Sequence, residues 1–418
     1  MTALSLHPSW LVGDLDDPAE TATFAEIAVS VDGEPLAQLE DPDTGRLSEG
    51  TRIPALPLAQ GLAQRWWRLL HEPEKHSDRR IEARHRLDVL TPGYVFPPLA
   101  LWSGGDGIVA RLLTPDLRFQ RQRFILPERD DPWYLPRLPV EGGLSAFIGA
   151  TLERLPAHTG AELRESWERV LCSRADAEEL AWCIAAGRLG FDPYDAETPD
   201  LEGLAGSLSP VLFADLSEAA TVEELPPARE WIEANQPAVA RAPQIRIGDL
   251  GKFPAPDPDD HPAHQGFAAA LRLRATLGRQ HPRDVLQELT GGAVFEVASG
   301  PRAVQGIAHR VNGMMSAVIR AYDDAQRRFR LCHAIFVGWD AGPGEDRLVS
   351  PAKTRRHQAA RAFAAELLAP TELLRERTDG RRPTGAQVEK WAEEFGTTAH
   401  VVKEQLWNRL RLPAQMTT

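Results

Sequence analysis

Two stretches of this sequence decide its fold: RRFRLCHAIFVGW at residues 327–339 and HQAARAFAAELLAP at residues 357–370. We expect a helix over residues 326–338 and a second helix through the FAAELLAP segment. Each stretch carries one histidine, His333 in the first and His357 in the second.

Read together, the two stretches resemble the core of the ImmA/IrrE family of zinc metallopeptidases. That family carries a helix of the form RRFTLAHELGHLL and then a helix of the form ExxANxFAAELLMP. The first zinc-binding histidine falls on His333, the catalytic glutamate on Ala334 and the second histidine on Val337. The third ligand, a glutamate in the family, falls on His357. The resemblance therefore implies a zincin-like scaffold with a degenerate HExxH motif, HAIFV.

The missing residues are the ones that the chemistry needs. In an HExxH helix the two histidines lie one turn apart and face one zinc ion, and the glutamate between them acts as the general base. Ala334 cannot accept a proton and Val337 cannot bind a metal. A catalytic zinc normally has three protein ligands and a structural zinc has four, so His333 and His357 alone are too few. No residue is assigned a catalytic role.

Two interpretations of the histidines stay open. In one, His333 and His357 hold zinc or another divalent metal together with a third donor, for which Asp340, Glu366 and Cys332 are the candidates. In the other, both histidines are relics that pack or form hydrogen bonds in the core. Glu366 lies within FAAELLAP, where a scaffold or capping role is the simpler interpretation. Cys332 is most simply a small core residue.

Composition restricts the partners. The net charge of −13 over 418 residues argues against broad binding to nucleic acids or to anionic membranes. No apolar run approaches the roughly 20 residues that span a bilayer, and the first twenty residues lack a basic segment followed by an apolar one, so we expect no secretory signal.

The three cysteines show no metal-binding CxxC spacing, which favours a reducing, cytoplasmic compartment.

We expect an α+β protein with several parts. Residues 1–157 form an α+β companion domain and 158–236 a helical region, both similar to regions of longer actinobacterial members of the family. Residues 237–264, rich in proline and acidic residues, are interpreted as an exposed linker. Residues 265–418 form the peptidase-like, mainly helical domain with a small sheet.

Local signals fix several element ends. Asp32-Gly33 predicts a hairpin turn after a strand. Asp176 is expected to cap the start of a helix, and Gly190 is expected to end that helix. A strand is expected at 293–298. Gly396 lies at the turn of a helix-turn-helix pattern near the C-terminus.

The favoured function is that of a pseudoenzyme that binds another protein in regulation or stress response. Because the resembling family commonly acts on helix-turn-helix repressors, such a repressor is the natural partner. The first alternative is an active metal-dependent enzyme with a site rebuilt from His333, His357 and a carboxylate such as Asp340. The second alternative is a DNA-associated regulator that uses the C-terminal helices, which the acidic composition disfavours.

Overall fold

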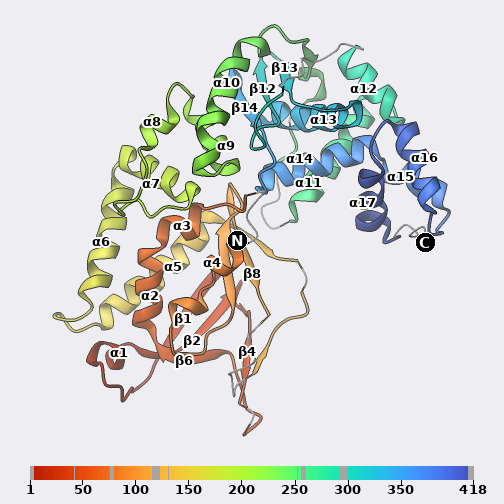
Figure 1. The fold of residues 1–418 in the computed structure, drawn as a ribbon. Coiled ribbons are helices and arrows are strands. Elements are labelled where there is room, and N and C mark those ends of the chain that lie inside the picture. Colours follow the sequence, from red (N-terminus) through yellow and green to blue (C-terminus); the bar gives the residue numbers. More distant parts are fainter. Residues whose placement is uncertain are drawn as a thin grey trace. The chain divides into compact units, whose positions relative to one another are not determined.

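The computed structural model describes the chain except residues 1–3, 42, 76–79, 115–122, 130, 252, 256–259, 292–298 and 413–418. The chain divides into two compact units, Met1–Leu201 and Glu202–Thr418. Each unit combines helices with small antiparallel sheets (Figure 1), as the α+β expectation requires. The division lies within residues 158–236, which the sequence predicts as a helical region.

The first unit begins with a sheet centred on β2, which pairs with β1 along one edge and with β3 and β6 along the other. Its strands are β1 (Leu4–Trp10), β2 (Phe24–Val31), β3 (Glu34–Pro35) and β6 (Gly50–Pro54). The hairpin turn predicted at Asp32-Gly33 is confirmed, and both residues have positive φ angles, 55° and 84°. Two positive φ values are typical of the tight turn that matches the twist of paired strands.

Two smaller sheets complete the strands of this unit. One has the order β10-β8-β7 and the other β5-β4-β9. Their strands are β7 (Leu99–Ser103), β8 (Gly107–Leu112), β10 (Trp133–Pro136), β4 (Gln38–Glu40), β5 (Leu47–Ser48) and β9 (Arg123–Ile125). β7 and β8 pair with each other across a short turn, with Ser103 opposite Ile108.

The helices of the first unit pack on these sheets and on one another. They are α1 (Pro18–Ala22), α2 (Ala55–Gln64), α3 (Trp66–His71), α4 (Ile81–Arg84), α5 (Arg137–Arg154), α6 (Ala161–Ala175) and α7 (Ala177–Leu189). Trp66 and Trp67 are buried, and Trp66 meets Trp167 edge to face at 5.1 Å between ring centroids. Asp176 caps α7 and Gly190 ends it with φ 86°, as predicted.

The second unit packs helices around a sheet of order β11-β13-β12-β14. Its strands are β11 (Ile245–Arg246), β12 (Gly306–Val311), β13 (Met314–Ile319) and β14 (Glu345–Val349). Its helices are α8 (Leu201–Ala205, which starts one residue before the boundary), α9 (Pro210–Ala219), α10 (Leu225–Val239), α11 (Pro262–Leu277), α12 (Pro282–Thr290), α13 (Asp324–Asp340), α14 (Arg355–Leu368), α15 (Thr371–Thr378), α16 (Gly385–Phe395) and α17 (Ala399–Leu410).

The segment 237–264, predicted to be an exposed linker, contains a buried part. Ile245 and Arg246 form β11, which pairs with β13 at the edge of the sheet. Ile245, Ile247 and Leu250 are buried in the core of the second unit. The strand expected at 293–298 lies outside the described residues.

α13 and α14 position the candidate site. They pack on each other beside the sheet (Figure 1), and Phe336 of α13 meets Phe363 of α14 at 5.4 Å between ring centroids. α11 lies close against α14 because Gly266 has no side chain, and a Cβ there would overlap the Ala359 carbonyl oxygen. Among the helices that the structure describes, none has the length and apolar content needed to cross a bilayer.

Candidate functional site

The structure brings the two candidate histidines into direct contact. His333 lies in the middle of α13 and His357 in the first turn of α14, with exposed fractions of 0% and 1%. His333 Nε2 and His357 Nδ1 share a hydrogen bond of 3.0 Å. The rings are tilted by 70°, with their centroids 5.2 Å apart. The two residues that the sequence singled out thus form one buried pair.

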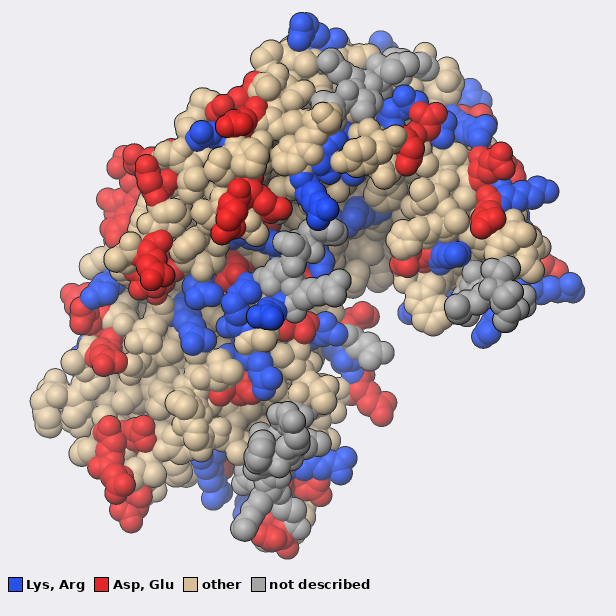
Figure 2. Space-filling model, in the orientation of Figure 1, with Lys and Arg blue, Asp and Glu red and all other residues tan. Residues whose placement is uncertain are grey.

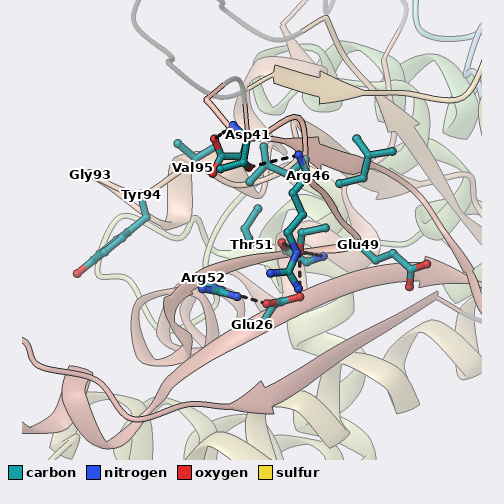
Figure 3. A pocket seen from close by; sticks show the side chains of 14 residues that line it. Glu26, Asp41, Arg46, Glu49, Thr51, Arg52, Gly93, Tyr94 and Val95 are labelled. Carbon is teal, nitrogen blue, oxygen red and sulfur yellow. Dashed lines mark hydrogen bonds and ion pairs between the residues drawn. The ribbon is translucent and has the colours of Figure 1, made fainter.

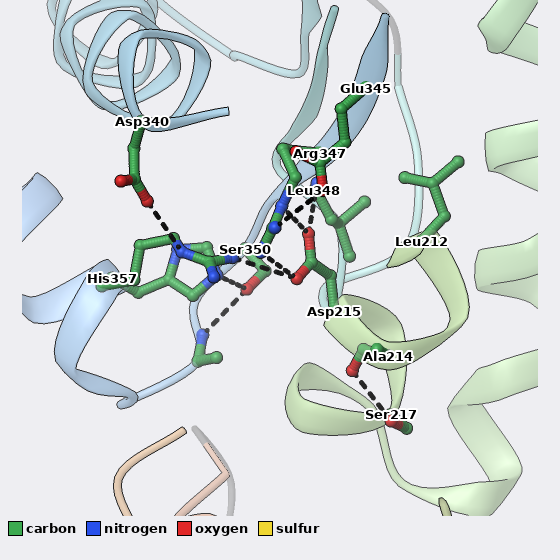
Figure 4. A network of polar contacts seen from close by, with 12 residues as sticks. Leu212, Ala214, Asp215, Ser217, Asp340, Glu345, Arg347, Leu348, Ser350 and His357 are labelled. Carbon is green, nitrogen blue, oxygen red and sulfur yellow. Dashed lines mark hydrogen bonds and ion pairs between the residues drawn. The ribbon is translucent and has the colours of Figure 1, made fainter. Parts of the chain in front are cut away.

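A serine that sequence reasoning missed extends this pair. Ser350 follows β14, and its Oγ shares a hydrogen bond of 3.0 Å with His357 Nε2 (Figure 4). The same Oγ accepts a hydrogen bond from the backbone N–H of Ala352. The result is a hydrogen-bonded chain from Ser350 through His357 to His333, at whose far end His333 Nδ1 is buried without a partner. No local spacing in the sequence marks Ser350, because it comes from a different element.

Both imidazoles are held neutral. Burial, which is the largest cause, and the positive charges of Arg361 and Arg330 together lower the pKa of His333 to about 3. The pKa of His357 is lowered well below its usual value by burial, by His333 and by Arg356 and Arg361. Neither histidine is therefore a proton acceptor of useful strength near pH 7.

Ala334 and Val337, where the resemblance in the sequence would place a catalytic glutamate and a second histidine, lie in the core. Ala334 and Val337 have exposed fractions of 0% and 1% and belong to the same apolar cluster as Ile335 and Phe336. Their side chains supply no lone pair and no proton. This face of α13 is therefore built for packing, and it would need both a base and a ligand to carry out metal-assisted hydrolysis.

Asp340 does not join the histidines. It is the last residue of α13, and its carboxylate forms an ion pair with Arg356 Nε at 3.3 Å (Figure 4). Cys332 is fully buried beside His333 in sequence, and burial raises the pKa of its thiol to about 12. The thiolate, which is the form that binds metals and attacks substrates, is thus strongly disfavoured.

Glu366 has a structural partner set instead of a metal. Its carboxylate is buried and accepts hydrogen bonds from the backbone N–H and the hydroxyl of Thr371, at 3.1 and 2.6 Å, and from Gln405 Nε2 at 2.7 Å. It therefore joins the end of α14 to the start of α15 and to α17. This is the scaffold role that the sequence favoured over ligation.

The residues present do not fit a zinc ion. Within the described part of the chain, no group of three or more His, Cys, Asp and Glu side chains is placed to hold a metal. The charges that act on the histidines come from Arg330, Arg356 and Arg361. Arginines around a two-nitrogen site repel a divalent cation, which normally gathers carboxylates or thiolates.

A network around Asp215, which sequence reasoning also missed, adjoins the histidines (Figure 4). Asp215 of α9 is almost fully buried and accepts two hydrogen bonds from Arg347, at 2.9 and 2.8 Å, and one from the backbone N–H of Leu348 at 3.0 Å. Arg356 also pairs with Asp215, at 3.2 Å. The network ties α9 to β14 and α14, and Arg356 extends it to Asp340.

The first unit contains a polar cavity of about 800 Å³. Figure 3 shows Arg46 reaching in from above and Glu26 paired with Arg52 below. Burial would raise the pKa of Glu26, but hydrogen bonds from Ser48 and Arg52 outweigh it, so that this pKa is lowered. The lining mixes both charges. The Ser48 hydroxyl donates to Glu26, whose lowered pKa makes it a weak base, so we assign the cavity no chemistry.

Comparison with protein-family models, with curated proteins and with solved structures gives no significant match to this chain. The functional argument therefore rests on the site itself.

Proposed function

We propose that this chain is a catalytically impaired protein with an ImmA/IrrE-like metallopeptidase fold, which acts by binding another protein in regulation or stress response. One observation carries the proposal. The two retained histidines are sealed in the core, bonded to each other and to Ser350, while Ala334 and Val337 fill the positions of the base and the second ligand. Such an arrangement supports α13 and α14 as a scaffold.

The natural partner is a protein, and a helix-turn-helix repressor is the first candidate, by extension of the resemblance seen in the sequence. The C-terminal helices favour this over DNA binding. α16 and α17 form the expected pair around Gly396, with φ 73°. The exposed face of α17 carries Lys403 and Glu404 together with the half-exposed Trp407. A face of mixed charge with an exposed indole suits a protein surface better than a phosphate backbone.

The decisive experiment measures bound metal and hydrolysis together. The full chain is purified without chelators or metal-binding tags, and its zinc and iron content is compared with that of His333→Ala and His357→Ala. We expect far less than one metal ion per chain in all three proteins, and no metal-dependent cleavage of a helix-turn-helix repressor. Stoichiometric metal that disappears in both variants would overturn the proposal in favour of a rebuilt metalloenzyme.

Binding is tested separately with repressors encoded in the same genome. Each fluorescently labelled repressor is titrated with the full chain, and its integrity is checked afterwards by mass spectrometry. Saturable binding without cleavage supports the proposal. Binding of labelled duplex DNA by the full chain alone, weakened steeply by salt, would instead support the DNA-associated alternative.

A further inference from the structure

Two arginines beside the histidine pair, Arg330 and Arg361, form no salt bridge with a carboxylate in the described part of the chain. Arg330 donates only to the Arg320 carbonyl oxygen, and Arg361 donates only to the Ala352 carbonyl oxygen, at 2.8 Å. In the described part of the chain, no carboxylate forms an ion pair with either guanidinium. Arg356, the third arginine near the histidines, is by contrast neutralised by Asp215 and Asp340.

The helices place both arginines next to the histidines. Arg330 precedes His333 by three residues on α13, and Arg361 follows His357 by four residues on α14, so each lies one turn from its histidine on the same face. The hydrogen bond between the histidines joins the two helices at this level. Arg320 and Ala352, whose carbonyl oxygens accept from the two arginines, follow β13 and β14, and both strands end opposite Gly306 of β12.

An unpaired guanidinium in such surroundings is costly. Burial lowers the pKa of Arg361 to about 10 and also lowers that of Arg330, but both side chains stay charged at pH 7. Buried charges in proteins are normally paired, and each of these groups has used one of its five N–H donors. Both residues are partly exposed.

We propose that Arg330 and Arg361 form a binding site for a phosphate dianion, either free phosphate or the phosphate group of a small phosphomonoester, beside the His333–His357 pair. Two fixed positive charges match a group of charge −1.5 to −2, and the planar fork of arginine suits phosphate oxygens. The proposal goes beyond the proposed function, since an anion would occupy the region where the resembling family holds a cation.

The test uses the full chain and inorganic phosphate, followed by thermal unfolding and by ³¹P NMR, with sodium chloride at equal ionic strength as the control. We expect a saturable rise in Tm with phosphate and none with chloride. Arg330→Gln and Arg361→Gln should each weaken phosphate binding about tenfold or more. Arg382→Gln, which removes one exposed positive charge from the same unit, should bind phosphate as the unaltered chain does.

Phenyl phosphate distinguishes the two sources of the dianion. Binding at least as tight as that of phosphate assigns the site to phosphomonoesters, and loss of binding assigns it to free phosphate.

Arg361→Met guards against a folding artefact: without phosphate it should melt no lower than the unaltered chain, because it removes an unpaired charge. A phosphate effect that is absent, or that persists in both glutamine variants, overturns the proposal without bearing on partner binding.

Discussion

At the scale of single residues, the buried histidine pair makes stability depend on pH. His333 and His357 have lowered pKa values in the folded chain, so below pH 6.5 the unfolded chain binds more protons than the folded one. Their contribution to stability is complete above pH 6.5 and falls as the pH drops, down to the folded pKa of His333 at about 3. Between pH 7 and pH 5 we expect a loss of about 2 kcal/mol per histidine.

Urea unfolding at a series of pH values checks this expectation. The double variant His333→Gln/His357→Gln should be less stable at pH 7 but should lose less stability on acidification. His400→Gln on the exposed face of α17 serves as the control for removing an imidazole. Equal pH slopes for the double variant and the unaltered chain would show that the pair does not titrate as described.

Glu366 offers a second prediction at this scale. Glu366→Ala removes the acceptor of three hydrogen bonds. The buried N–H and hydroxyl of Thr371 lose this partner, and Gln405 Nε2 keeps only its hydrogen bond to the Ala369 carbonyl oxygen. We expect a loss of about 2–4 kcal/mol in the free energy of unfolding. Glu372→Ala, which removes an exposed partner of Arg375, should change it by less than about 1 kcal/mol.

Measuring bound metal distinguishes a structural role of Glu366 from a role as a metal ligand. The amount of bound metal per chain should be the same in Glu366→Ala as in the unaltered chain. A variant that unfolds normally but differs in bound metal would contradict the hydrogen-bond role.

The resemblance in the sequence marks His333 and His357, and the structure joins them by a hydrogen bond. The sequence could not single out Ser350 or Asp215. The serine reaches the site from β14, and Asp215 meets Arg347 from 132 residues away in the chain. Such contacts depend on how elements pack, and no local spacing encodes them.

At the scale of elements, the ends were predictable where local chemistry fixes them. Asp32-Gly33, Gly190 and Gly396 mark turns or helix ends because their positive φ angles are a local requirement. The sequence predicts a linker around Ile245 because the segment is rich in prolines and acidic residues. In the structure Ile245 is buried because it pairs with Met315 of β13. An edge strand of two residues carries too little pattern to be seen before its partner is known.

The contact between α5 and β1 gives a matched test at this scale. Gly143 lies against β1, and a Cβ there would overlap the Leu4 carbonyl oxygen, whereas a Cβ on the neighbouring Gly142 meets nothing within 4 Å. Gly143→Ala should therefore destabilise the first unit by about 2 kcal/mol or more. Gly142→Ala should be neutral or should stabilise by about 0.5–1 kcal/mol, because alanine favours a helix. Thermal unfolding of both variants measures the two changes in stability. Equal changes would show that Gly143 does not lie against β1.

At the scale of the whole molecule, the apolar cores lie on either side of residue 201. One core cluster runs from Leu4 to Cys183, and the two clusters that contain α13, α14 and the C-terminal helices run from Ile245 to Leu406. Each unit has about 200 residues, a size at which a chain buries roughly 70% of its unfolded surface. Each unit therefore has a core of its own that is large enough for independent folding.

We therefore expect fragments 1–200 and 201–418, separated just before α8, to fold on their own. Each should unfold cooperatively in urea with an m-value near half of that expected for the full length, since m follows the surface exposed. The fragment 201–418 should keep the reduced stability at acidic pH that the histidine pair imposes, and 1–200 should keep the difference between Gly143→Ala and Gly142→Ala. A fragment that stays unfolded until the other fragment is added would instead show that the two units fold as a single cooperative unit.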